Sequence, residues 1–348
     1  MGKLNTDAQW IGITMGCPVG IGPEITLKFL ASFEGQGQFL PVVVGDVGVL
    51  KHCAQALGMK LRFQLWQPGA VYQPGVTMVC VPRYPEGVVL DPEKLIWGRP
   101  SRITGVAMAA AIEETVKLVQ RGEFAAMVTC PITKTALHGA GYHYPGHTEM
   151  LATLCQTRDY AMMMAGRSLK VTLVTIHQGL STVAAALTRD AIVRLIELTG
   201  KSLVFDFGLS APRLAVAGFN PHAGEGGMFG HEEELVIAPA VNLARDRGWQ
   251  VSGPFPPDTV FHKAVKGYFD AVICMYHDQG LIPFKLLHFD DGVNVTIGLP
   301  LVRTSVDHGT AYDIAGQDKA NPASLQAAFR MAGEIASNRK QRAEAERK

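Results

Sequence analysis

The chain has 348 residues, 47% of them hydrophobic and 18% charged, so it can bury one large or two medium cores and is too apolar to be disordered. Its 32 Lys and Arg against 31 Asp and Glu give a formal net charge of +1, which excludes an overall field that recruits nucleic acid or an acidic membrane surface. An anionic ligand would have to be held by a local cluster of side chains.

Targeting signals and cysteine spacing point to an ordinary cytoplasmic protein. The first ten residues lack the apolar core of a secretory signal, and no later run approaches the roughly 18 apolar residues of a membrane span. The six cysteines are scattered without a C-x-x-C pair, as expected of reduced thiols. We therefore expect a soluble chain with neither a membrane nor a nucleic-acid partner.

Short apolar runs alternate with longer amphipathic stretches, which is typical of a mostly parallel sheet covered by helices. The candidate strands are Ile11 to Met15, Pro41 to Val44, Arg62 to Trp66, Thr77 to Val81, Ala126 to Cys130, Lys170 to Ile176, Arg213 to Ala217, Ala271 to Tyr276 and Val293 to Ile297. An alanine-rich helix over Ile103 to Gln120, preceded by Pro- and Gly-rich stretches, suggests a boundary between two lobes near residue 100. The polar tail Asn338 to Lys348 is expected to fray.

The first polar cluster is Gly16 to Glu24, GCPVGIGPE, between a strand and a helix over Glu24 to Phe33. Its glycines would let the backbone approach a ligand, and the free amides of the helix would attract an anion. A tight turn without a ligand explains the pattern equally well. The dinucleotide fingerprint G-x-G-x-x-G is absent, both here and at Gly224 to Gly230.

A second cluster follows the strand that ends at Cys130. It continues into Gly146-His147-Thr148-Glu149, where a helix is expected to begin. Thr148 could cap that helix, and His147 could donate to an anion or a carboxylate. Capping alone accounts for Thr148, and an exposed histidine is the simpler alternative for His147.

Three histidines each follow a candidate strand: His177, His222 and His277. Neutral imidazoles suit zinc, iron, cobalt or nickel, and three protein ligands leave room for a substrate oxygen. Asp278 and Glu225, each close in sequence to one of these histidines, could orient the rings. The spacing does not prove that the three rings converge, and each histidine could instead be structural.

Lys285, Asn294 and Arg303 supply a point charge, an amide donor and a planar fork within one stretch of chain. This is a usual complement for a phosphate or a carboxylate. Taken singly, each would pass for an ordinary surface residue. Their density after His277 favours an anion site.

Several long motifs together carry a family resemblance. They are GIGPE (20 to 24), GHTE (146 to 149), NPHAGEGG (220 to 227), YHDQG (276 to 280), GVNVTIGLP (292 to 300) and RTSVDHGTAYDIAG (303 to 316). These blocks resemble the 4-hydroxythreonine-4-phosphate dehydrogenases of pyridoxine biosynthesis and their catabolic relatives, over about Ile11 to Phe329.

The resemblance implies a two-domain α/β/α subunit with mostly parallel sheets, like isocitrate and isopropylmalate dehydrogenases, and an active site in the interdomain cleft. We expect a cofactor-side domain from residues 1–100 plus 290–348. Residues 101–289 would form the domain for metal, substrate and dimerisation. The relatives lack the usual dinucleotide fingerprint, which agrees with its absence here.

The family's site residues fall on positions of this chain. Its metal ligands correspond to His177, His222 and His277, holding one divalent ion (Zn, Mg, Co, Mn, Fe or Ni) in a site shared across a homodimer. Its substrate-binding residues correspond to His147, Thr148, Lys285, Asn294 and Arg303. The cofactor-side candidates for NAD or NADP are His308, Gly309 and Asp313.

The implied reaction is a metal-dependent NAD(P) oxidation of a 4-phosphorylated four-carbon hydroxy acid, after which the 3-oxo acid loses carbon dioxide. Lys285 and Asp258 are the two candidates for the base, and the sequence does not choose between them.

The chain departs from the family pattern at two places. Met15 and Cys17 stand where the family usually has Pro and Asp, and Pro145 stands where the biosynthetic enzymes tend to have Thr. The second departure favours the branches that oxidise D-threonate or D-erythronate 4-phosphate, or aromatic cis-dihydrodiols. Outside this reaction class, a phosphate acyltransferase of related fold and a catalytically silent binding protein are the alternatives.

Overall fold

The structure of the protein is a computed structural model that describes residues 8–35 and 37–347. We based the expected absence of a secretory signal on the first ten residues, and most of these lie outside the described range. The chain divides into two compact units, the first up to Arg158 plus Leu299–Ala336, the second Asp159–Gly298 plus the segment from Ser337 onward. The first unit thus extends well past the predicted boundary near residue 100.

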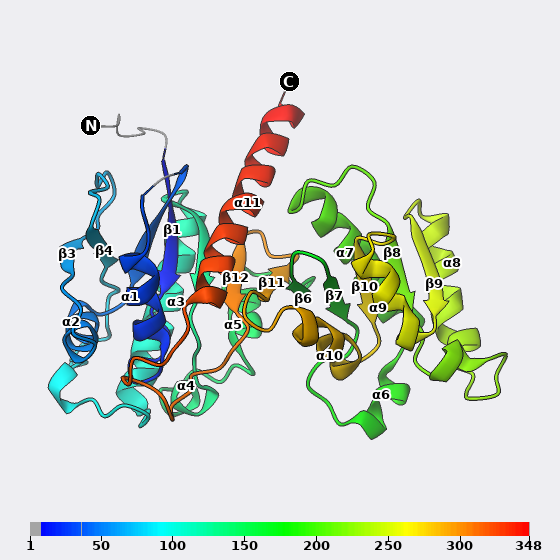
Figure 1. Cartoon of the computed structure of the whole chain (residues 1–348), viewed down its shortest axis with the longest axis horizontal. Helices are drawn as coiled ribbons and strands as arrows, with labels where there is room; N and C mark the ends of the chain where they lie inside the picture. The colour runs from blue at the N-terminus through cyan, green and yellow to red at the C-terminus, as the bar shows by residue number, and fades with distance from the viewer. Residues whose placement is uncertain (1–7, 36, 348) are drawn as a thin grey trace. The chain divides into compact units, whose positions relative to one another are not determined.

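The first unit contains a parallel sheet in the order β3-β4-β2-β1-β5-β12 (Figure 1). The strands are β1 (Gln9–Thr14), β2 (Phe39–Val44), β3 (Arg62–Leu65), β4 (Val76–Cys80), β5 (Phe124–Thr129) and β12 (Arg303–Val306). The helices are α1 (Gly22–Ala31), α2 (Val47–Ala56), α3 (Arg102–Gln120), α4 (Lys134–Gly139), α5 (His147–Leu154) and the first part of α11 (Ala323–Glu346), with a short turn η1 (Pro92–Lys94). Helix α3 packs on β1, β2 and β5.

The second unit holds strands in the order β11-β6-β7-β10-β8-β9. They are β6 (Ala161–Ala165), β7 (Lys170–Leu173), β8 (Leu214–Ala217), β9 (Val251–Phe255), β10 (Ala271–Cys274) and β11 (Val293–Ile297). Its helical segments are α6 (Leu180–Ala186), α7 (Arg189–Phe205), η2 (Pro221–Gly224), η3 (Glu233–Ile237), α8 (Ala238–Asp246), α9 (Pro257–Val265) and α10 (His277–Leu287). Strand β6 is antiparallel to β7 and β11, while β7, β10, β8 and β9 are parallel.

The mostly parallel α/β prediction is confirmed, and all nine predicted strands overlap strands of the structure. Three strands of the structure were not predicted, because their own sequences are not typical of strands. Strand β6 reads Ala-Met-Met-Met-Ala and lacks β-branched residues, β9 contains a Gly-Pro pair, and β12 opens with Arg303. Such strands form because neighbouring strands and helices cover them, which outweighs weak local propensity.

The polar tail is helical as far as Glu346, where α11 ends, so the part expected to fray beyond its helix is shorter than predicted. The tail is held by Asp206, a carboxylate at the end of α7 that is 3% exposed. The Asn338 amide donates to the Asp206 carbonyl at 2.7 Å, and Arg339 Nε donates to its carboxylate at 2.6 Å. A polar helix end thus stays ordered because its side chains bind a buried acceptor.

The structure also bears on membrane association. In the part of the chain that it describes, no helix has the length and apolar character needed to cross a bilayer.

Candidate active site

The three predicted metal ligands follow three adjacent strands of the second unit. Strand β10 lies between β7 and β8, and all three run parallel. His277 is the first residue of α10, directly after β10, while His177 follows β7 and His222 lies in η2 after β8. Because parallel strands end at the same edge of a sheet, the histidines share the edge where ligands bind in open α/β sheets.

Two of the three rings lie next to each other. The centroids of His177 and His277 are 5.8 Å apart. Two imidazoles on one tetrahedral metal, with metal–nitrogen bonds of about 2.1 Å, would have centroids about 5 Å apart. The carboxylate Oδ1 of Asp278 lies 2.6 Å from His277 Nδ1, so the predicted orienting contact is present. With Nδ1 donating to Asp278, Nε2 would be the atom free to bind a metal.

His222 lies in a turn with unusual backbone geometry. Its φ is +52°, that of Ala223 is +55° and that of Glu225 is +42°, all in the left-handed region. Its ring is 6.1 Å from the Phe229 ring. Within the described residues of one chain, no three or more His, Cys, Asp or Glu side chains form a group that could hold a metal. Three imidazoles are chemically suited to a divalent metal, and the rings of His177 and His277 lie close enough to share one. The site with all three ligands stays a prediction.

A buried carboxylate that the sequence analysis missed supports the His222 turn. Glu233 is 5% exposed, and its Oε1 accepts the N–H groups of Phe219 and Asn220, each at 2.7 Å. Its Oε2 accepts the Asn220 amide at 2.9 Å. Glu233 sits in a run of three glutamates from 232 to 234, so its sequence context does not distinguish it.

The two candidate bases differ in position. Asp258 lies in the first turn of α9, directly after β9, and α9 packs against the η2 turn that carries His222. Lys285 lies in the last turn of α10, eight residues beyond His277, which is about 12 Å along the helix axis. Asp258 therefore lies at the histidine edge, whereas Lys285 is two turns away from it.

Asn294 lies on β11, separated from β10 by β6 and β7. Its Oδ1 is buried and has no hydrogen-bond partner among the described residues. A buried acceptor without a hydrogen bond destabilises the folded chain. Such an acceptor is therefore typical of a position where a bound ligand or a water molecule donates the missing hydrogen bond. The grouping of Asn294 and Lys285 with Arg303 stays a prediction.

Arg303 is the centre of a cluster in the first unit. It is 3% exposed and donates through Nε and Nη2 to the Thr129 hydroxyl, at 3.1 and 2.7 Å. Burial lowers the pKa of Arg303 to about 10, and the nearby Glu149 carboxylate partly opposes this shift. The guanidinium still carries its charge at neutral pH. Thr129 is the last residue of β5, and the sequence analysis missed it.

His147 belongs to the same cluster and opens α5. Burial, and then the charge of Arg303, hold the pKa of His147 well below its usual 6.5, so the ring is neutral. Its Nε2 is buried and has no hydrogen-bond partner among the described residues. A neutral imidazole beside a buried guanidinium suits the binding of a phosphate or carboxylate. Thr148 does not cap the helix, because Gly146 is the N-cap and Thr148 is already inside the first turn.

The predicted cofactor loop packs against the glycine-rich turn of the same unit. The Ile21 N–H donates to the Thr310 carbonyl at 3.1 Å, and the Tyr312 hydroxyl lies 3.4 Å from Cys17 Sγ. His308 Nδ1 lies 3.1 Å from the Gly309 carbonyl, and Asp313 is exposed in the loop. The structure therefore brings two of the predicted ligand-binding segments together.

Cys17 does not replace the carboxylate that the family usually has at this position. It is fully buried, and burial raises the pKa of its thiol above the usual value, so the side chain is neutral. An interaction that needs a negative charge at position 17 itself is therefore missing from this chain.

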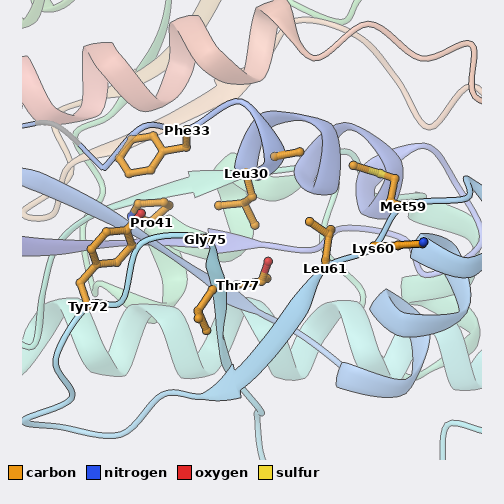
Figure 2. Close-up of a pocket in the computed structure, with 11 residues that line it drawn as sticks. Leu30, Phe33, Pro41, Met59, Lys60, Leu61, Tyr72, Gly75 and Thr77 are labelled. Carbon is orange, nitrogen blue, oxygen red and sulfur yellow. The ribbon is translucent and has the colours of Figure 1, made fainter.

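The first unit also contains a cavity of about 410 Å³ that none of the predicted site residues lines. Figure 2 shows Phe33 and Tyr72 on one side of it and Met59 and Leu61 on the other. It lies beside the first residues of β2 and β4. Ligands of open α/β sheets bind at the opposite, carboxyl ends of the strands, so this cavity is not part of the candidate active site.

Comparisons with known proteins identify related sequences and structures. The family model described as "Pyridoxal phosphate biosynthetic protein PdxA" matches residues 38–332. The 4-hydroxythreonine-4-phosphate dehydrogenase of Desulfosudis oleivorans is 54% identical over 92% of this chain and 94% of its own length. The D-threonate 4-phosphate dehydrogenase of Cupriavidus necator is 44% identical over 94% of this chain and 98% of its own. A crystal structure of 4-hydroxythreonine-4-phosphate dehydrogenase from Klebsiella pneumoniae is similar with a TM-score of 0.86, at 41% identity over 94% of this chain and all of the other.

Proposed function

Because the chain belongs to the family of the pyridoxal phosphate biosynthetic protein PdxA, whose relatives above are dehydrogenases, we propose that it oxidises a 4-phosphorylated four-carbon hydroxy acid with NAD or NADP. The substrate is of the 4-phosphooxy-threonine type, and its 3-oxo acid product loses carbon dioxide. The observation that carries this proposal is the high identity to the D. oleivorans enzyme over nearly the whole of both chains.

The cluster around Arg303 supports a phosphorylated substrate. A buried guanidinium that already donates to the Thr129 hydroxyl, with a neutral His147 beside it, is suited to a doubly charged anion. Lys285, Asn294 and Thr148 complete the proposed substrate-binding set. In this role, the unsatisfied Oδ1 of Asn294 accepts a hydrogen bond from the substrate.

We assign the metal site to His177, His222 and His277. A bound divalent cation would lower the pKa of the substrate hydroxyl, which is the chemistry that the oxidation needs. Asp278 fixes the ring of His277 so that Nε2 is available. Of the two candidate bases, the position of Asp258 at the histidine edge favours it over Lys285 for removal of the hydroxyl proton.

A homodimer is the proposed assembly, with the metal ligands shared between subunits. Helix α10, which begins at His277, exposes the apolar side chains of Ile282 (68% exposed) and Leu286 (85%), one helical turn apart, and the exposed Phe289 (76%) lies just beyond the end of the helix. An apolar stripe of this kind is typical of a protein–protein interface. A second subunit covering it would lie against the helix that carries a proposed ligand.

All cysteines in the described part of the chain are free, which supports a cytoplasmic location.

D-threonate 4-phosphate is the second candidate substrate, supported by the likeness to the C. necator enzyme and by Pro145 before the Gly146 motif. It carries a hydroxyl where 4-phosphooxy-threonine carries an amino group, so the phosphate site serves both. Aromatic cis-dihydrodiols lack the phosphate, so Arg303 could pair only with a ring carboxylate where the substrate carries one.

A substrate panel tests the proposal. Metal-loaded protein is mixed with NAD or NADP and with 4-phosphooxy-threonine, D-threonate 4-phosphate, D-erythronate 4-phosphate or an aromatic cis-dihydrodiol, and reduced nicotinamide is followed by absorbance. We expect turnover only with the phosphorylated acids. Absence of nicotinamide reduction with every substrate would contradict a dehydrogenase, and formation of an acyl phosphate in a separate mixture of an acyl thioester and inorganic phosphate would favour an acyltransferase.

A further inference from the structure

The side-chain amide of Gln279 joins the ends of two neighbouring strands. Gln279 lies in the first turn of α10 and is 7% exposed. Its Oε1 accepts the Met275 N–H at 2.7 Å, and its Nε2 donates to the Gly218 carbonyl at 2.7 Å. Met275 follows β10 and Gly218 follows β8. One buried side chain therefore connects the turn that carries His277 to the turn that carries His222.

The Gly218 end of this connection is itself fixed. The Gly218 N–H donates to the carbonyl of the last residue of β9 at 2.8 Å. The next two peptide N–H groups, of Phe219 and Asn220, donate to Glu233. The peptide N–H groups of residues 218 to 220 thus each have a defined partner, and Gln279 links this network to Met275 at the end of β10.

The turn beyond this network needs such support. His222, Ala223 and Glu225 have left-handed φ values, a conformation that is unfavourable for any residue other than glycine. Backbone of this kind persists only where its surroundings hold it. The position of the His222 ring therefore depends on the anchoring of the residues before it.

We propose that Gln279 is a positioning residue for the metal site, setting the His222 turn relative to the start of α10. The inference rests on the proposed function, because it assigns the histidines to a metal. It applies whether one subunit or two supply the three imidazoles, since both turns belong to every chain. Loss of a group that orients metal ligands typically weakens metal binding about 10- to 100-fold.

Substitutions at Gln279 separate this role from simple packing. Gln279→Met keeps the length and bulk of the side chain and removes both hydrogen bonds. Gln279→Glu keeps an acceptor for Met275 and loses the donor to Gly218. Gln250→Met is the matched control, because Gln250 is exposed and precedes β9 at the other end of the strands.

The experiment titrates cobalt(II) into purified, metal-free protein. The dissociation constant and the visible absorption of the bound ion are recorded for wild type and the three variants, together with their circular dichroism and melting temperatures. We expect Gln279→Met to bind cobalt at least about tenfold more weakly with an altered spectrum. Gln279→Glu should fall between it and wild type, and Gln250→Met should match wild type.

Two results would overturn the inference, and they differ in what they say about function. If a folded Gln279→Met variant binds cobalt as wild type does, with the same spectrum, the positioning role is wrong while the metal site stands. If Gln279→Met does not fold, wild-type binding by Gln279→Glu leads to the same conclusion. If wild type itself binds no cobalt, both the metal assignment and the inference fail.

Discussion

At the scale of single residues, the chemistry of this protein depends on how burial changes ordinary side chains. Burial keeps His147 neutral and lowers the pKa of Arg303, yet the guanidinium stays charged at neutral pH. The two residues are 156 positions apart in sequence, and Arg303 reaches the Thr129 hydroxyl because β12 pairs with β5. The residue types were predictable from sequence motifs. The Thr129 contact was not, because it depends on strand pairing, and the effect of Arg303 on His147 was not, because it depends on how distant segments pack.

The neutral state of His147 predicts a loss of stability at acidic pH. Its pKa is lowered in the folded chain, so below about pH 6.5 the unfolded chain binds a proton that the folded chain does not. The free energy of unfolding should therefore fall with decreasing pH, by up to about 1.4 kcal/mol per pH unit from this group. His147→Gln should show a smaller loss between pH 7 and pH 5 in urea unfolding. His143→Gln, at an exposed histidine nearby, should keep the wild-type slope.

The fork of Arg303 predicts a specific loss in substrate binding. Lysine keeps the charge in Arg303→Lys but cannot make the same set of planar hydrogen bonds to Thr129 and an anion. We expect KM for the phosphorylated substrate to rise about 10- to 100-fold, with a smaller change in kcat, corresponding to about 1.5 to 3 kcal/mol. Steady-state kinetics measure this split. An unchanged KM would remove Arg303 from the substrate site.

At the scale of elements, the sequence predicted strands with apolar β-branched runs and missed those that depend on their neighbours. The histidines at strand ends could be found because His177 and His277 directly follow an apolar run and His222 follows one after a short turn. Gln279 and Glu233 could not be assigned a role, since both bind backbone groups of the turn that follows β8, which is distant from them in sequence. The same reason explains the tail of α11, whose polar residues look like a fraying end until Asp206 is placed beside them.

The contact between α11 and Asp206 predicts a measurable effect on stability. Asp206→Ala would remove the acceptor for Arg339 Nε and for the Ser202 hydroxyl, at 2.6 Å each. Because Arg339 is partly solvated, we expect a loss of about 1 to 3 kcal/mol in the free energy of unfolding. Hydrogen exchange at residues 337–346 should accelerate. Wild-type exchange in this segment would show that Asp206 does not hold the helix.

At the scale of the whole molecule, the fold class and the family could be predicted from the sequence, because long motifs and alternating elements extend along most of the chain. The limits of the compact units could not. Pro- and Gly-rich loops near residue 90 resemble a linker, but α3 packs on the strands that precede it and keeps both segments in the first unit.

The exposed stripe on α10 predicts that assembly and activity are linked. Leu286→Glu places a charge on the most exposed of the three side chains, and it should shift the chain from dimer to monomer and reduce turnover together. Sedimentation measures the first effect and nicotinamide reduction the second. Leu65→Glu, at an exposed leucine of the first unit, is the control. A fully active monomer would contradict a site shared between subunits.

The proposed catalytic centre is tested most directly by metal removal and readdition in wild type and His222→Ala, followed by nicotinamide reduction on the phosphorylated substrate. Wild type should lose turnover on chelation and regain it when about one divalent ion per subunit is added back. His222→Ala should stay inactive after metal is added. Its melting temperature without metal should equal that of wild type, which shows that the fold is intact. Full turnover by the chelated wild type, or by His222→Ala, would contradict a metal centre built on these histidines.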